Sequence, residues 1–185
     1  GVEIARDLSE LQDRLPPFPR AQAEQILAEE LAPEIRATIA QMSDAIAAAS
    51  IAQVHKVTLK PQSEGAPPRV RALKILRPGV EREFAADLEA FAWAAHKLES
   101  VSAEAVRLRP VALIDTLARS IAIEMDLRLE GAAAVEMANN TAKDADFRVP
   151  AVDWDLTTRR LLATEWIDGT SVKDRDALVA AGHDL

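Results

Sequence analysis

The stretch AAASIAQV, residues 47–54, determines how the rest of the chain is interpreted. Taken alone it favours a helix, because alanine has the highest helix propensity of all residues. The residues that follow favour a different structure. Apolar and polar residues alternate over residues 53–60, as they do in a half-buried strand. Residues 61–69 (PQSEGAPPR) then have the composition of a turn, and residues 70–76 form a second β-like run that contains Lys74.

This order of loop, strand, turn and strand fits a nucleotide-binding loop of the kinase type, which reads G-x-G-x-x-G-x-V and precedes a strand lysine. With Val54 on the valine of the motif, the three glycine positions fall on Ala47, Ala49 and Ala52. Alanine adds only one methyl group, so the backbone can still approach a phosphate, but easy access to positive φ is lost. The predicted cofactor-binding residues of this loop are Ala47, Ala48, Ala49, Ser50, Ala52 and Val54.

Lys74 is the first candidate for a catalytic residue, because an unpaired ammonium group inside an apolar strand would be costly. It could meet phosphate groups and a helix carboxylate, as kinase lysines do, or it could be a surface residue on an edge strand. The candidate carboxylates are Glu124, Asp126 and Glu130, in a helix predicted over residues 111–139. Glu124 and Asp126 are separated by roughly 200° around a helix, so they cannot both point at Lys74. The sequence does not decide which of the three acids pairs with Lys74. The alternative is that all three lie on a solvated acidic face of the helix.

Four blocks, in order along the chain, resemble the UbiB family of atypical kinase-like proteins, which is linked to ubiquinone biosynthesis. They are AAASIAQV (47–54), ALKILRPGVE (72–81), EMDLRLEGAAAVEMANN (124–140) and TTRRLLATEWIDG (157–169). The resemblance implies an Ala-rich loop in place of the Gly-rich loop and an E-x-D motif on a helix. It also implies that the full-length protein binds ATP or ADP with Mg²⁺.

The expected fold is α+β, namely a protein-kinase-like amino-terminal lobe with an antiparallel sheet of about five strands. Residues 1–41 are expected to be a helical, family-specific extension, and residues 42–169 the lobe itself. Residues 170–185 would begin the linker and helix that lead to a carboxy-terminal lobe. The expected helices cover residues 2–14, 20–31, 33–41, 81–100, 111–139 and 174–181, and the last two strands cover residues 149–155 and 159–166.

Residues 165–169 (EWIDG) are expected to be the hinge of this lobe. The backbone C=O of Glu165 and the N–H of Ile167 could bond the edge of an adenine; the alternative is an ordinary strand end. Residues 170–185 contain neither the kinase catalytic loop nor the D-F-G motif. The fragment by itself is therefore expected to be inactive, and the base and principal Mg²⁺ aspartate would belong to the carboxy-terminal lobe.

Three functions remain open from the sequence. The first is the nucleotide-binding lobe of an atypical ATPase or phosphotransferase that supports ubiquinone biosynthesis. The second is a non-catalytic, pseudokinase-like scaffold that senses nucleotide, and the third is a purely helical interaction module. The resemblance implies a carboxy-terminal lobe of the same chain as partner, with a lipid or isoprenoid substrate or ubiquinone-biosynthesis proteins. Self-association through an apolar surface is also expected.

Composition narrows these classes further. A net charge of −8 argues against a nucleic-acid-binding surface. The chain has no cysteine, which excludes thiolate metal sites, and its histidines (His55, His96 and His183) show no metal-ligand spacing. No apolar run is long enough for a transmembrane helix. The expected location is cytoplasmic, or peripheral to the inner membrane in the full-length protein.

Overall fold

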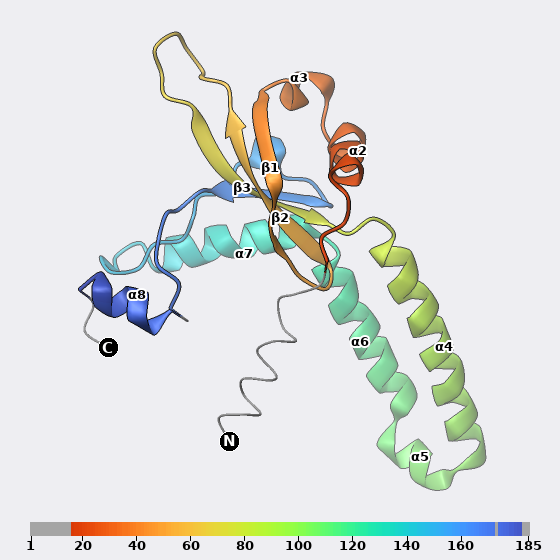
Figure 1. Ribbon diagram of the computed structural model, residues 1–185. Coiled ribbons are helices and arrows are strands. Elements are labelled where there is room, and N and C mark those ends of the chain that lie inside the picture. The colour runs from red at the N-terminus through yellow and green to blue at the C-terminus, as the bar shows by residue number, and fades with distance from the viewer. Residues whose placement is uncertain (1–15, 173, 183–185) are drawn as a thin grey trace.

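The computed structural model describes residues 16–172 and 174–182, so the helix predicted over residues 2–14 lies outside the described residues. The fold is α+β and is built on a four-stranded antiparallel sheet with the strand order β1-β2-β3-β4 (Figure 1). The strands are β1 (Ile39–Ala48), β2 (Ala52–Leu59), β3 (Arg69–Leu76) and β4 (Leu161–Glu165). The helical alternative for the alanine run is wrong, because this run ends β1, makes the turn and begins β2.

The helices fall into an amino-terminal pair, a projecting arm, and a helix against the sheet (Figure 1). The pair is α2 (Arg20–Glu30) and α3 (Pro33–Arg36). The arm consists of α4 (Val80–Val101), α5 (Ala103–Leu108) and α6 (Pro110–Glu124). The remaining helical elements are α7 (Leu127–Asn140), the short 3₁₀ helix η1 (Trp154–Leu156) and α8 (Arg175–Ala180).

The two faces of the sheet carry separate apolar clusters, because successive side chains of a strand point to opposite sides. On one face, α2 packs through Ile26 and Leu27 against Val57, Leu73 and Leu161; this is the first apolar cluster. On the other face, the second apolar cluster joins the sheet to α7 and to the base of the arm. Its buried members are Ala52, Leu76, Val80, Met125, Leu127 and Leu162.

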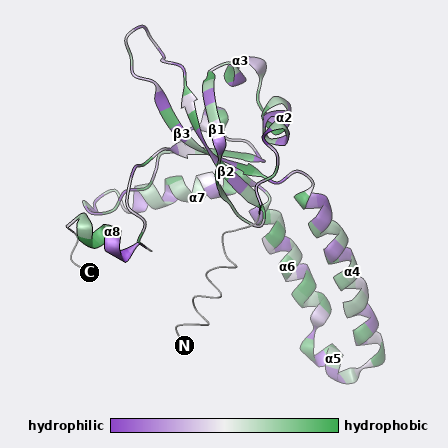
Figure 2. Ribbon diagram, viewed as in Figure 1, coloured by the Kyte–Doolittle hydropathy of each residue, from purple (hydrophilic) through white to green (hydrophobic). Residues whose placement is uncertain are grey.

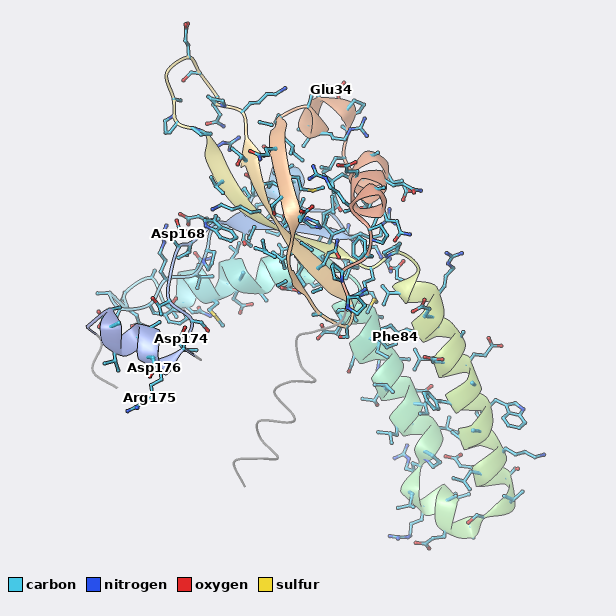
Figure 3. All side chains as sticks on the ribbon, in the orientation of Figure 1. Glu34, Phe84, Asp168, Asp174, Arg175 and Asp176 are labelled. Carbon is cyan, nitrogen blue, oxygen red and sulfur yellow. The ribbon has the colours of Figure 1, made fainter. Side chains whose placement is uncertain are left out.

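The arm extends away from the sheet, with α4 beside α6 and α5 at the far end (Figure 1). At its base, Phe84 of α4 packs partly buried against the second apolar cluster (Figure 3). Apolar residues nevertheless recur along both helices of the arm (Figure 2). Trp93 on α4 is 70% exposed and Leu113 on α6 is 66% exposed. The arm therefore buries only part of its apolar surface within the described residues.

The predicted third helix starts where expected but is shorter, and the predicted strand over residues 149–155 was wrong. The helix predicted to continue to residue 41 ends at Arg36, and the chain enters β1 at Ile39. The strand predicted over residues 149–155 is reduced to one bridge between Val152 and Thr164, followed by η1. Pro150 has no N–H to donate, which limits pairing in this segment.

The long helix predicted over residues 111–139 is two helices, α6 and α7. Asp126 separates them with an extended backbone (φ −120°, ψ 93°), and its carboxylate accepts a hydrogen bond from the Arg128 N–H. An aspartate in this position caps the next helix, because its oxygen satisfies an N–H that has no partner within the helix. The predicted helices over residues 81–100 and 174–181 are confirmed as α4 and α8, with small shifts at their ends.

Candidate functional site

The Ala-rich segment forms a tight hairpin turn between β1 and β2. Ala47 pairs with Val54 across the hairpin, and the N–H of Ala49 donates to the C=O of Ala52 at 2.8 Å. Among the described residues, Arg109 is the one non-glycine residue with a positive φ, so every residue of the turn keeps a negative φ. This backbone explains how alanines can stand at positions that kinases fill with glycine.

The six predicted loop residues occupy different environments. Ala49 and Ser50 are exposed in the turn, and Ala47 is exposed near the end of β1, next to the half-buried Ala48. Ala52 is only 2% exposed, and its methyl group belongs to the second apolar cluster. The exposed members of the set, Ala47, Ala49 and Ser50, are therefore the ones most open to a ligand.

Lys74 is on β3, which lies between β2 and β4, so the edge-strand alternative was wrong. Its neighbours across the strands are Val54 and Leu162. Its Nζ donates to both carboxylate oxygens of Glu130, at 2.7 Å and 3.0 Å. Glu130 therefore fills the pairing role that the sequence left open among three acids.

A cleft of about 440 Å³ opens beside this ion pair. Besides Lys74 and Glu130, its lining includes Glu124 at the end of α6 and Asp126 at the start of α7. The break between the two helices brings these acids to one place, which a single straight helix would not do. The remaining lining residues are apolar: Ile123, Leu129 and Ala133.

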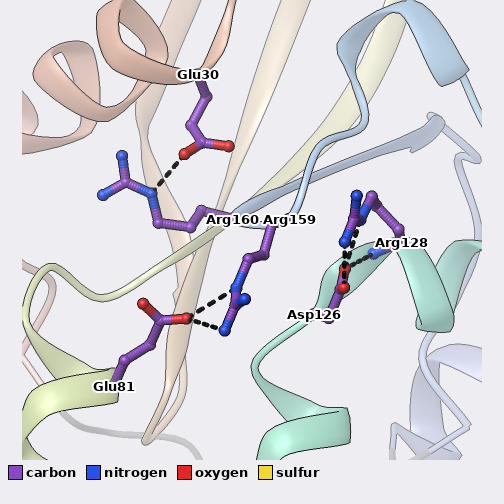
Figure 4. A network of polar contacts seen from close by, with 6 residues as sticks. All are labelled: Glu30, Glu81, Asp126, Arg128, Arg159 and Arg160. Atoms are coloured by element: carbon purple, nitrogen blue, oxygen red, sulfur yellow. Dashed lines mark hydrogen bonds and ion pairs between the residues drawn. The ribbon is translucent and has the colours of Figure 1, made fainter.

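Asp126 is held in its ionised form by a neighbouring arginine. Its carboxylate accepts hydrogen bonds from the side chain and the backbone N–H of Arg128 (Figure 4). The side-chain bond is the main cause that lowers the pKa of Asp126, and the same bond raises the pKa of Arg128. The E-x-D motif thus serves two purposes, because Asp126 both caps α7 and presents a carboxylate to the cleft.

Residues that the sequence analysis did not single out fix α7 against the sheet. The N–H of Leu127 donates to the C=O of Arg159 at 2.9 Å. Gly131 allows a close approach, since a Cβ there would lie 3.2 Å from Trp154 and 3.3 Å from Leu162. A glycine inside an otherwise helical pattern was the available signal for this contact.

Two consecutive arginines before β4 connect it to other elements (Figure 4). Arg159 pairs with Glu81 on α4 at 2.8 Å, and Arg160 pairs with Glu29 and Glu30 on α2. Burial raises the pKa of Glu30, but hydrogen bonds from Thr158 and Arg160 outweigh burial and lower it overall. These ion pairs connect α2 and the base of the arm to the segment that leads into β4.

The predicted hinge follows β4. The N–H of Glu165 donates to the C=O of Ala151 at 2.8 Å, and the N–H of Trp166 donates to the C=O of Val70 at 3.3 Å. The ring of Trp166 lies 4.4 Å from the ammonium group of Lys56 on β2, and Ile167 is 41% exposed. The predicted hinge segment is thereby tied to β2, β3 and the segment beside β4.

In residues 16–172 and 174–182, no group of three or more His, Cys, Asp or Glu side chains is arranged to hold a metal ion. In the same part of the chain, no helix is both long enough and apolar enough to span a membrane.

Comparisons with known proteins agree with this geometry. A family profile described as the ABC1 atypical kinase-like domain matches residues 10–185. The probable protein kinase UbiB of Shewanella piezotolerans is 39% identical over 184 residues, which cover 99% of this chain and 33% of that protein. The protein of the same description from Marinobacter nauticus is 36% identical over 184 residues, 99% of this chain and 32% of the relative. The chain spans about a third of the length of these relatives. It belongs to the ABC1 atypical kinase-like family.

Proposed function

We propose that this chain is the nucleotide-binding lobe of an atypical kinase-like ATPase or phosphotransferase that supports ubiquinone biosynthesis. The observation that carries the proposal is the Lys74–Glu130 pair, which joins a central strand to α7 beside a cleft with two further carboxylates. An ion pair of a strand lysine and a helix glutamate is the arrangement that kinases need in place for phosphoryl transfer. Relatives described as probable protein kinases support the same class.

The residues that line the cleft suit a magnesium nucleotide. A volume of about 440 Å³ lies within the usual range for ligand sites. Lys74 would hold phosphate oxygens, and Glu130 would orient its ammonium group. Glu124 would offer a carboxylate of the kind that Mg²⁺ prefers, and Asp126 would become a second ligand by exchanging its pairing with Arg128. When bound, Mg-ATP would supply the phosphoryl group, and its metal would neutralise the charge on the phosphates.

The remaining predicted contacts lie on either side of Lys74. The exposed turn at Ala49 and Ser50 would cover the phosphates, and Val54 would lie under the nucleotide on the same face of the sheet as Lys74. The C=O of Glu165 and the N–H of Ile167 would bond the adenine edge. The rest of the full-length protein would supply the catalytic base and act on a lipid or isoprenoid intermediate, or on ubiquinone-biosynthesis proteins.

The test is thermal and chemical unfolding of the full-length protein with and without Mg-ATP or Mg-ADP. Nucleotide at about 100 times its dissociation constant should stabilise the folded state by roughly 2.7 kcal/mol. Lys74→Ala should abolish this shift. Lys60→Ala, which removes an exposed lysine just after β2, is the matched control and should retain it. No shift with either nucleotide would refute nucleotide binding. Binding without turnover would favour the nucleotide-sensing scaffold.

A further inference from the structure

Arg77 directly follows strand β3 (Arg69–Leu76) in the connection to α4, and it contacts two separate parts of the chain. Its Nε donates to the C=O of Ala49 at 3.0 Å, and its backbone N–H donates to the C=O of Ile51 at 2.8 Å. Its terminal nitrogen donates to the C=O of Pro16 at 3.1 Å, and its guanidinium lies 5.9 Å from the ring of Phe18. One arginine thus joins the Ala-rich turn to the segment before α2.

The same segment, residues 16–19, is also held by the buried side chain of Gln53. Gln53 on β2 is 1% exposed, and its amide bonds both backbone groups of Phe18. Its Oε1 accepts from the Phe18 N–H at 2.9 Å, and its Nε2 donates to the Phe18 C=O at 3.3 Å. The same Nε2 lies 2.8 Å from Nε2 of His55, whose Nδ1 lies 2.8 Å from the C=O of Ser43. With Gln53 as donor, His55 accepts at Nε2 and donates from Nδ1 to that carbonyl.

The contact to Ala49 has a directional consequence for the turn. The C=O and N–H groups of a trans peptide point in opposite directions, and the described residues contain no cis peptide. Holding the Ala49 carbonyl on Arg77 therefore fixes the Ser50 N–H on the opposite side of that peptide. A turn without glycine has few other shapes to adopt, so this contact adds to the backbone bonds Ala49–Ala52 and Arg77–Ile51 in setting its orientation.

We infer that Arg77 is a positioning residue for nucleotide binding, and that through it the affinity of the Ala-rich turn depends on docking of residues 16–19. The inference rests on the proposed function. Arg77 itself does not line the cleft beside Lys74; it acts through the turn. Undocking residues 16–19 would remove the Pro16 and Phe18 contacts that hold the guanidinium in place under Ala49.

The test compares Arg77→Gln, Arg77→Lys, Gln53→Met and the double variant Arg77→Gln/Gln53→Met in the full-length protein. The dissociation constant of Mg-ADP is measured well below each unfolding midpoint, so that stability does not enter the comparison. Arg82→Gln, an exposed arginine on the first turn of α4, is the matched control. Amide hydrogen exchange at residues 16–22 and 47–54 is followed in the same proteins without nucleotide.

Arg77→Gln should raise the dissociation constant about tenfold, which corresponds to roughly 1.4 kcal/mol, and should speed exchange in both segments. Arg77→Lys keeps the charge and should recover part of the affinity, while Arg82→Gln should change neither quantity. Gln53→Met should weaken binding when Arg77 is present and should add little when it is absent. Such non-additivity is the signature of residues that act through one another.

An unchanged dissociation constant in Arg77→Gln, with binding still abolished by Lys74→Ala, would overturn this inference and leave the proposed function standing. Equal effects of Gln53→Met in both backgrounds would overturn the coupling between the two segments. If Arg77→Gln does not fold, the cycle is run with Arg77→Lys. A wild-type protein that binds no nucleotide would overturn the proposed function, and this inference with it.

Discussion

Lys74 and Glu130 lie 56 residues apart in the sequence, and both carboxylate oxygens of Glu130 are within hydrogen-bond distance of the same ammonium group. The side chains are partly exposed, 29% for Lys74 and 47% for Glu130. Pairs as open as this one contribute little to folding, typically about 0–1 kcal/mol. The pair therefore contributes little to holding the fold together, which is compatible with the ligand-binding role proposed above.

Replacing Glu130 should separate the small contribution of this ion pair to stability from its proposed role in nucleotide binding. Glu130→Gln should lower the free energy of unfolding by less than about 1 kcal/mol, since the pair is open to solvent. It should weaken Mg-nucleotide binding much more, because Lys74 would lose the group that orients it. Urea unfolding and calorimetric titration of the full-length protein measure the two effects. A large loss of stability with unchanged binding would contradict the prediction.

Asp126 combines a structural and an electrostatic role, and two substitutions should separate them. Asp126→Ala removes the cap of α7 and should cost about 0.5–2 kcal/mol of stability. Asp126→Asn keeps a capping oxygen and should retain most of that stability, but it removes a charge from the cleft. Both should weaken the Mg²⁺ dependence of nucleotide binding. Urea unfolding and titrations at several Mg²⁺ concentrations provide the measurements.

Gly131 should not tolerate a branched side chain. Gly131→Val would push against Trp154 and the buried Leu162, and overpacking of this kind typically costs about 1–3 kcal/mol. The control is Ala132→Val at the next, exposed position of α7, which places the same side chain in solvent. The loss of unfolding free energy should be clearly larger for Gly131→Val. Equal losses would mean that α7 can move away from β4 at no cost.

Replacing Ala49 by glycine, the residue that kinases have at this position of the loop, should destabilise the turn. Ala49 has a negative φ, so Ala49→Gly gains no native contact and adds freedom to the unfolded chain. The expected loss is about 0.4–1 kcal/mol in the unfolding free energy. The added freedom of the turn should also change the ratio of ATP to ADP affinity. Unchanged affinity for both nucleotides, together with unchanged activity, would refute a role of Ala49 in nucleotide preference.

The ion pairs of Arg160 should make stability sensitive to acid. Glu30 has a pKa below its ordinary value of 4.5 in the folded protein, so the unfolded chain binds more protons in this range. Its contribution is fully present above the unfolded pKa and is lost as pH falls through the folded pKa. The unfolding free energy should therefore fall below about pH 4.5, and less steeply in Glu30→Gln. Urea unfolding at a series of pH values tests this, and identical slopes would contradict it.

Local patterns predicted the hairpin and its lysine because both depend on nearby residues. The alternation of residues 53–60 and the turn composition of residues 61–69 describe β2, the connection and β3 directly. β1 was missed because much of IAQMSDAIAA favours a helix, and its strand conformation depends on pairing with β2. The turn between β1 and β2 contains no glycine, so its residues alone do not predict which way its peptide groups point.

The pairing of Lys74 with Glu130 could not be derived from the sequence for a similar reason. It depends on the relative rotation of α6 and α7, which the break at Asp126 sets. In a straight helix, Glu124 and Glu130 would project in directions about 120° apart around the axis. Neither glycine nor proline marks the break; only the capping aspartate does.

The two ends of the arm lie close together, which allows the length of the arm to differ between related proteins. Val80 at the start of α4 and Met125 just after α6 belong to the same buried cluster, so the arm leaves the sheet and returns to it at one place. Matched additions or deletions of whole helical turns in α4 and α6 would change the reach of the arm without altering the separation of Lys74 and Glu130. The interval between these residues along the chain can thus lengthen or shorten during evolution while the ion pair stays the same.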